Sequence, residues 1–169
     1  MSDNDHLTEQ SEQLIQFDGR DQAQSLILQL AQQAKRQICF LGNNIDPILF
    51  DNTEFVDCIS EFARRSDKTI IKLLIHSSQT NIQNGHRLIP LIQRLTSSIQ
   101  LNITAEQHQD SLNMFMVVDK TSYLYCPSYL RYQGKCCFHD PTEARDLKKT
   151  FNDRWDNSMP DTMTRRLNI

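Results

Sequence analysis

A nearly unbroken apolar run at residues 68–76 (KTIIKLLIH) constrains the fold more than any other segment of this chain. It is the strongest strand signal in the sequence, because isoleucine and leucine dominate it. The apolar residues do not alternate with polar ones, so both faces of the strand must be covered by other elements. The run therefore predicts a central strand at Thr69–Ile75, with a strand at Phe115–Val118 as its close neighbour.

Helical and strand-like patterns alternate around this run. Asp21 can cap the first helix, Thr53 can start the second, and Pro141 is suited to the first turn of the last one. The expected helices are 21–36, one from 53 onward, 85–98 and 141–157, and the expected strands are 37–41, 69–75, 99–104, 115–118, 123–126 and 135–138. This order predicts an α/β fold, a three-layer α/β/α sandwich with a mixed, largely parallel sheet.

Length and composition predict one ordinary globular domain. The chain has 169 residues, of which 38% are hydrophobic and 23% are charged, and this suits a single core. The expected organisation is a disordered acidic tail at 1–13, an α/β domain at 14–157 and a C-terminal tail at 158–169. No apolar run approaches the roughly 20 residues that span a bilayer. The polar N-terminus and the odd count of five cysteines predict a cytoplasmic protein with reduced thiols.

The net charge of −3 is unevenly distributed. Residues 1–61 hold 11 acidic and 3 basic side chains, whereas residues 62–169 hold 10 acidic and 15 basic ones. Two interpretations remain open: an acidic tail with ordinary solvated helices, or a mildly basic surface that meets an anion or an acidic partner. The bias falls short of that expected for a dedicated nucleic-acid-binding protein.

The stretch from Asn113 to Ser128 (NMFMVVDKTSYLYCPS) is typical of a strand that ends on Asp119, a polar turn, a second strand and a small polar residue. This order resembles the end of the phospholipase D superfamily motif, His-x-Lys-x-x-x-x-Asp. Counted back from Asp119, Leu112 stands at the position of the nucleophilic histidine and Met114 at that of the phosphate-binding lysine. The resemblance therefore implies the fold without its standard chemistry.

The resemblance covers about residues 18–157, which are similar to one half of the phospholipase D fold. The short motifs GHRL, RYQG and FHDP occur here in the order in which they resemble a bacterial family of single phospholipase-D-like domains. The resemblance implies two facing halves, which single-half members build by homodimerisation. We expect a non-catalytic domain that binds an anionic or phosphate-containing ligand, or that acts as an interaction module. The alternative is a phosphodiesterase or nuclease with a relocated histidine site.

Candidate site residues follow from the same pattern. His86 and Arg87 come after Gly85 at the expected start of a helix, where free N–H groups and the helix dipole favour an anion. His76 ends the preceding strand, so His76 and His86 are the candidate catalytic pair of the alternative. The ligand-binding candidates are His86, Arg87, Asp119, Arg131 and His139. Capping, packing and surface roles are the competing interpretation of each.

The remaining patterns predict no metal and no cofactor. Cys136, Cys137 and His139 superficially resemble a zinc half-site, but adjacent residues on a strand point to opposite faces. The chain has four glycines and no phosphate-binding glycine loop. Four tyrosines between 123 and 132 lie near Arg131. Base stacking and ordinary packing both explain them, so the sequence leaves nucleic acid open as a partner.

Overall fold

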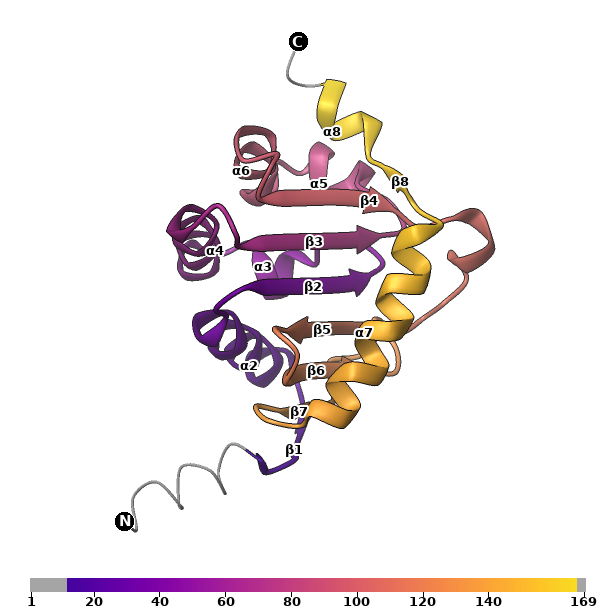
Figure 1. Cartoon of the computed structure of the whole chain (residues 1–169). Coiled ribbons are helices and arrows are strands. Elements are labelled where there is room, and N and C mark those ends of the chain that lie inside the picture. The colour runs from indigo at the N-terminus through magenta and orange to yellow at the C-terminus, as the bar shows by residue number, and fades with distance from the viewer. Residues whose placement is uncertain (1–11, 167–169) are drawn as a thin grey trace.

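The computed structural model describes residues 12–166, which form an α/β fold around one mixed sheet (Figure 1). Its strands are β1 (Ile15–Asp18), β2 (Gln37–Gly42), β3 (Ile70–Ile75), β4 (Ile99–Ile103), β5 (Met114–Val118), β6 (Ser122–Cys126), β7 (Gln133–Cys137) and β8 (Met159–Pro160). Its helices are α2 (Arg20–Gln33), α3 (Pro47–Phe50), α4 (Thr53–Arg65), α5 (Gln79–Gln83), α6 (Leu88–Arg94), α7 (Pro141–Asp156) and α8 (Thr162–Arg166), with a 3₁₀ turn at Glu106–His108.

The strand order is β1-β7-β6-β5-β2-β3-β4-β8. Only the β2–β3 and β3–β4 pairs are parallel, and the other five pairs are antiparallel. The prediction of a mixed α/β sheet is confirmed, but the prediction that it is largely parallel is wrong. Parallel neighbours need a crossover connection, which α4 and α6 supply on either side of β3. The segments that join β5, β6 and β7 are too short for a crossover, so these strands reverse direction.

The predicted strand at residues 69–75 is confirmed as β3, an internal strand of the sheet. Leu74 and Ile75 are fully buried, and β3 pairs along its length with β2 and β4. The strand at residues 115–118 is confirmed within β5, but it does not adjoin β3. β2 lies between them, because β2 pairs with β3 on one edge and with β5 on the other.

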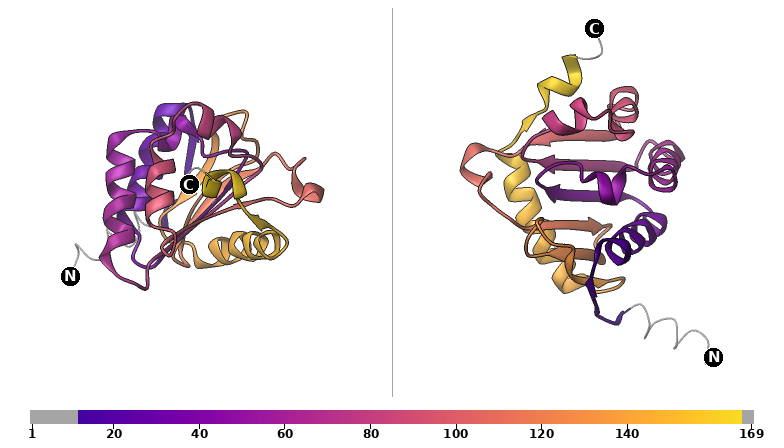
Figure 2. Two further views of the ribbon diagram at one scale, coloured as in Figure 1. Left: turned by 90° about the horizontal axis from the view of Figure 1, so that it is seen from above. Right: turned by 180° about the vertical axis from the view of Figure 1, so that it is seen from behind.

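Helices cover both faces of the sheet, and alternate residues of the strands enter two separate cores. On β2, Ile38 and Phe40 join the larger core, to which α2, α4 and α6 contribute. Cys39 and Leu41 point to the other face and pack against residues of α7. Figure 1 shows α7 crossing one face of the sheet, and the rear view in Figure 2 shows the indigo and magenta helices over the other.

The sequence of α7 explains where that helix begins and which side it buries. The side chain of Asp140 accepts a hydrogen bond from the backbone N–H of Glu143, and Pro141 occupies the first turn. Ala144, Leu147 and Phe151 are its buried residues, with the spacing of one helical face. The predicted helix at residues 141–157 is therefore confirmed.

Residues 158–166 fall in the predicted C-terminal tail. They form β8, which pairs with β4 at Asn102 and Ile103, and the short helix α8. Most of the predicted N-terminal tail lies outside the described residues. Among the helices of residues 12–166, none combines the length and apolar character that a membrane crossing requires.

Candidate functional site

The edge of the sheet where β2, β3 and β4 end, called here the carboxyl edge, is the usual ligand side of parallel strands. Gly42 ends β2 and His76 follows β3 at this edge. Met114 begins β5 here, because β5 runs antiparallel to β2. Leu112 and Met114, the two positions that the sequence resemblance singled out, therefore lie at the carboxyl edge.

His76 is buried at this edge, and both ring nitrogens have protein partners. Nδ1 lies 3.2 Å from the hydroxyl of Thr104, and Nε2 lies 3.0 Å from the carbonyl oxygen of Ser111. A carbonyl can only accept, so Nε2 carries a proton. The Thr104 hydroxyl also donates to the carbonyl of Ile75 at 3.1 Å. The ring thus joins the end of β3 to the segment that leads into β5.

The nearby cation is also bound within the protein. Arg154 of α7 donates from Nη1 to Ser111 Oγ at 3.0 Å and to Asn113 Oδ1 at 3.4 Å. The Ser111 hydroxyl donates to Asn113 Oδ1 at 2.6 Å. Arg154 therefore holds the entry to β5 in place rather than pointing into an open cleft.

Leu112 and Met114 are both apolar, but they differ in solvent exposure. Met114 is buried, whereas the side chain of Leu112 is 48% exposed. The backbone N–H of Tyr129 donates to the carbonyl of Leu112 at 2.8 Å, and the next residue, Leu130, is 72% exposed. Leu112 and Leu130, called here the leucine patch, therefore lie close together at the carboxyl edge.

A pocket of about 250 Å³ lies beside the leucine patch. Its lining residues are Asn43, Asn44, Asp46, Pro47, Ile48, Met114, Tyr129, Leu130 and Tyr132. Asp46 accepts hydrogen bonds from the N–H of Ile48 and from the hydroxyl of Tyr132 at 2.9 Å. Burial, reinforced by Asp46, raises the pKa of Tyr132 above its ordinary value. The pocket therefore carries one carboxylate and no cation, which disfavours an anionic ligand.

His86 and Arg87 lie at the same edge but not at the start of a long helix. The predicted helix at residues 85–98 is present but shorter: Gly85 adopts a φ of +65° after α5, and α6 spans only Leu88–Arg94. The side chain of Asp51 accepts from the N–H of Arg87 at 3.2 Å and lies 3.7 Å from Arg87 Nε. A carboxylate of the chain itself thus occupies the place where the sequence predicted an external anion.

His86 is buried, and its Nδ1 accepts from the N–H of Leu88 at 3.1 Å. Its Nε2 therefore carries the proton and has no hydrogen-bond partner. Burial lowers the pKa of His86, although Asp51 and Asp46 oppose this shift. The ring is neutral, and no hydrogen bond joins it to His76.

Asp119 lies at the edge opposite the carboxyl edge, where β2 begins and β5 ends. It has a φ of +55°, and its carboxylate accepts from the N–H groups of Lys35 at 3.1 Å, Arg36 at 2.8 Å and Gln37 at 3.1 Å. These bonds fasten the β5–β6 turn to the start of β2. Asp119 is therefore separated from His76 by the length of the central strands.

Arg131 and His139 lie at opposite ends of β7. Arg131 is exposed in an open groove of about 730 Å³ that Ser128, Tyr125 and Lys135 also line. His139 is exposed next to Asp140, whose N–H donates to the carbonyl of Thr121 in the β5–β6 turn. The predicted ligand residues therefore divide into two groups, with His86, Arg87 and Arg131 at the carboxyl edge and Asp119 and His139 at the other.

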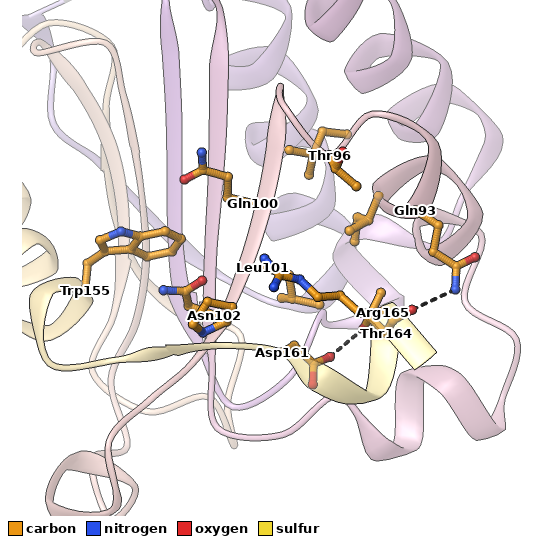
Figure 3. A pocket seen from close by; sticks show the side chains of 12 residues that line it. Gln93, Thr96, Gln100, Leu101, Asn102, Trp155, Asp161, Thr164 and Arg165 are labelled. Atoms are coloured by element: carbon orange, nitrogen blue, oxygen red, sulfur yellow. Dashed lines mark hydrogen bonds between the residues drawn. The ribbon is translucent and has the colours of Figure 1, made fainter. Parts of the chain in front are cut away.

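A further pocket, of about 280 Å³, lies beside β4 and was not predicted from the sequence (Figure 3). Trp155, Gln100 and Asn102 line it, and Arg165 extends over it from α8. Lys72 Nζ lies 5.2 Å from the centre of the Trp155 ring. The tryptophan was recognisable only as part of a helix face, and α8 falls in the predicted tail, so no local pattern marked this pocket.

The adjacent cysteines lie on opposite faces, as predicted. Cys136 belongs to the larger core and Cys137 to the core under α7. Burial raises the pKa of the Cys136 thiol to about 12. In the part of the chain that the structure describes, no two cysteines are joined by a disulfide. Within residues 12–166, no group of three or more acidic, cysteine or histidine side chains is arranged to hold a metal ion.

This fold is similar to that of phospholipase D proteins. Nuc of Salmonella typhimurium, a phospholipase D family member, matches with a TM-score of 0.63 and 14% identity over 88% of this chain and 97% of its own. NucT of Helicobacter pylori matches with a TM-score of 0.63 and 9% identity over 88% of this chain and 99% of its own. The archaeal chromatin protein TrmBL2, described as showing a novel mode of DNA binding, matches with a TM-score of 0.65 and 11% identity over 89% of this chain.

At these identities the likeness shows the fold alone, and the chain spans 54% of TrmBL2. The chain belongs to the family defined as a domain of unknown function, DUF7931, whose model matches residues 19–167. No curated protein matches the sequence.

Asp119 should stabilise the fold. Asp119→Ala removes the acceptor of three backbone N–H groups and places alanine in the left-handed region. Loss of the acceptor costs about 1–3 kcal/mol, and the left-handed backbone conformation costs alanine about 1–2 kcal/mol. The free energy of unfolding should therefore fall by about 2–5 kcal/mol. Asp119→Asn should cost less, because asparagine keeps one acceptor and tolerates this φ. Urea unfolding measures both, and an alanine variant as stable as the wild type would contradict the structural role.

Proposed function

We propose that this chain is a non-catalytic phospholipase-D-like domain that acts as an interaction module through its carboxyl edge. The proposal depends mainly on one observation. Where a phospholipase D motif would supply histidine and lysine, the chain has the exposed Leu112 and the buried Met114. An exposed apolar side chain at the ligand edge favours contact with another surface over contact with a charged substrate.

The hydrogen bonds at this edge also favour a non-catalytic role. Phosphoryl transfer through a covalent intermediate needs a nucleophile and donors for the phosphoryl oxygens. Both nitrogens of His76 have partners, Arg154 is bound to Ser111 and Asn113, and His86 is buried. The alternative, a phosphodiesterase or nuclease that uses His76 or His86, would require these side chains to leave their present contacts.

The purified protein should not hydrolyse bis(p-nitrophenyl) phosphate, single-stranded DNA or duplex DNA. His76→Asn and His86→Asn test the alternative, because asparagine at 86 still offers an acceptor to the N–H of Leu88. His139→Asn is the matched control, since this histidine is exposed at the opposite edge. Turnover that persists in the control but disappears in the His86 or His76 variant would make the relocated-histidine enzyme the better explanation.

A second copy of this chain is the partner that the family resemblance favours. Single phospholipase-D-like halves are expected to pair through the edge that carries the motif. The chain is similar to nearly the full length of Nuc and NucT, at 97% and 99% of those chains. In such a pair the leucine patch of each copy would be removed from water.

Leu112→Ser with Leu130→Ser should weaken this dimer. Full burial of a leucine contributes about 1.5–3 kcal/mol, and the dimer holds two copies of each partly exposed leucine, so losing all four should raise the dimer Kd by at least about 100-fold. Sedimentation equilibrium over a range of concentrations measures this change. Met159→Ser with Met163→Ser is the matched control, because these side chains are exposed beside β4 and in α8. A monomeric wild type, or equal effects of both double variants, would contradict pairing through the leucine patch.

A phosphate-containing ligand in the groove at Arg131 is a second candidate. The guanidinium of Arg131 is exposed there, and within the described residues it takes part in no ion pair. The neighbouring Lys135 lies 3.3 Å from Glu143, so its charge is partly balanced. Asp18 also lines the groove, but no ion pair joins it to Arg131 within the described residues, so Arg131 supplies the unpaired positive charge there.

Arg131→Gln should weaken a phosphate or mononucleotide ligand. A hydrogen bond to a charged group contributes about 1.5–3 kcal/mol, so the expected loss of affinity is about tenfold or more. Calorimetric titration of both ligands measures it, and Arg87→Gln serves as the comparison because Arg87 is paired with Asp51. A response lost in Arg87→Gln and kept in Arg131→Gln would move the site to the start of α6.

A further inference from the structure

The edge opposite the carboxyl edge, where β2, β3 and β4 begin, gathers exposed cations from several elements. Two follow α2, two end α4, one precedes β3, one ends α6 and one lies in the β5–β6 turn. We call them the basic edge: Lys35, Arg36, Arg64, Arg65, Lys68, Arg94 and Lys120. They are seven of the 18 lysines and arginines in the chain, so this edge holds a large share of its positive charge.

Hydrogen bonds show that these segments adjoin one another. Asp119, next to Lys120, accepts from the N–H groups of Lys35 and Arg36. The carbonyl of Arg36 accepts from the N–H of Ile70, two residues beyond Lys68. Arg65 Nη1 donates to the carbonyl of Ala34 at 3.1 Å. The segments that carry Lys35, Arg36, Arg65, Lys68 and Lys120 therefore adjoin one another, and Figure 1 shows the starts of β2, β3 and β4 on the left of the view.

Little negative charge balances this surface. Glu61, Asp67 and Asp119 are the carboxylates of the same segments, and Asp140 adjoins the β5–β6 turn. Seven cations and four carboxylates leave a net charge of +3, although the whole chain carries −3. The carboxylate of Asp119 is already bound by three backbone N–H groups. In residues 12–166 the two ion pairs are Arg87–Asp51 and Lys135–Glu143, neither of which involves the basic edge.

The helix dipole explains part of this arrangement. A cation at the carboxyl end of a helix is favourable, and α4 and α6 end in Arg64, Arg65 and Arg94. Lys68 and Lys120, by contrast, lie in turns next to strands. The helix dipole therefore accounts for the cations at the helix ends. It does not account for the cations in the turns, which extend the charged surface beyond the helices.

We propose that the basic edge binds the phosphate backbone of duplex nucleic acid. Adjacent cations along a strip match the regular phosphates of a duplex, whose charge density exceeds that of a single strand. The segments of the basic edge expose no aromatic side chain, so bases would have no stacking surface. Binding is therefore independent of base sequence, and it uses the edge opposite the leucine patch and Arg131.

Fluorescence anisotropy with a labelled duplex of arbitrary sequence tests this assignment in the full chain. Contact with about four phosphates predicts a slope of about −3.6 in log K against log salt, so affinity should fall on the order of 100-fold between 50 and 200 mM salt. Neutralising three contacts with Lys35→Gln, Arg36→Gln and Lys68→Gln should weaken binding at 50 mM salt and reduce the slope by about 3.

Arg20→Gln, Arg87→Gln and Lys149→Gln form the matched control, because these exposed residues lie at the start of α2, before α6 and in the middle of α7, outside the basic edge, and give the same net charge. The control should bind as the wild type does, and circular dichroism should show both variants folded. Absence of binding at 50 mM salt, or equal losses in both triple variants, would overturn the proposal. Displacement by poly-glutamate at charge concentrations equal to the duplex would also overturn it, in favour of an acidic protein partner.

Discussion

The structure depends on the burial of β2 on both faces and along both edges. One edge of β2 pairs with β3 in parallel, and the other edge pairs with β5 in antiparallel orientation. The parallel and antiparallel parts of the sheet therefore meet at β2. Ile38 and Phe40 enter one core while Cys39 and Leu41 enter the other. The packing of the helices on each face therefore depends on the correct register of β2. Asp119 fixes where the strand starts, and this gives the aspartate a structural role.

Apolar patterning predicted most elements, because residues buried on one or both faces leave a local signal. The runs in β2 and β3, and the buried stripe of α7, are of this kind. Strand direction is different, since it depends on whether the connection is long enough for a crossover. The short segments between β5, β6 and β7 make this half of the sheet antiparallel. The general alternation of helices and strands in the sequence does not reveal that direction.

The candidate site was harder to predict than the fold. Sequence spacing singled out Leu112 and Met114, and the structure has both at the carboxyl edge, because Met114 begins β5 there and Leu112 lies two residues before it. It did not show that Asp51 lies against Arg87, since that contact joins segments 36 residues apart. It also missed the pocket beside β4, where Arg165 comes from a helix that the sequence did not indicate. Contacts of this kind depend on how distant elements pack.

Trp155 gives this fold a built-in optical signal. It is the chain's single tryptophan, and it stacks on Phe151 at 5.6 Å while Lys72 of β3 lies over its ring. Its emission therefore reports the docking of α7 on the sheet from one defined position. A shift in that emission would separate loosening of α7 from fraying elsewhere, without a label and without altering the chain.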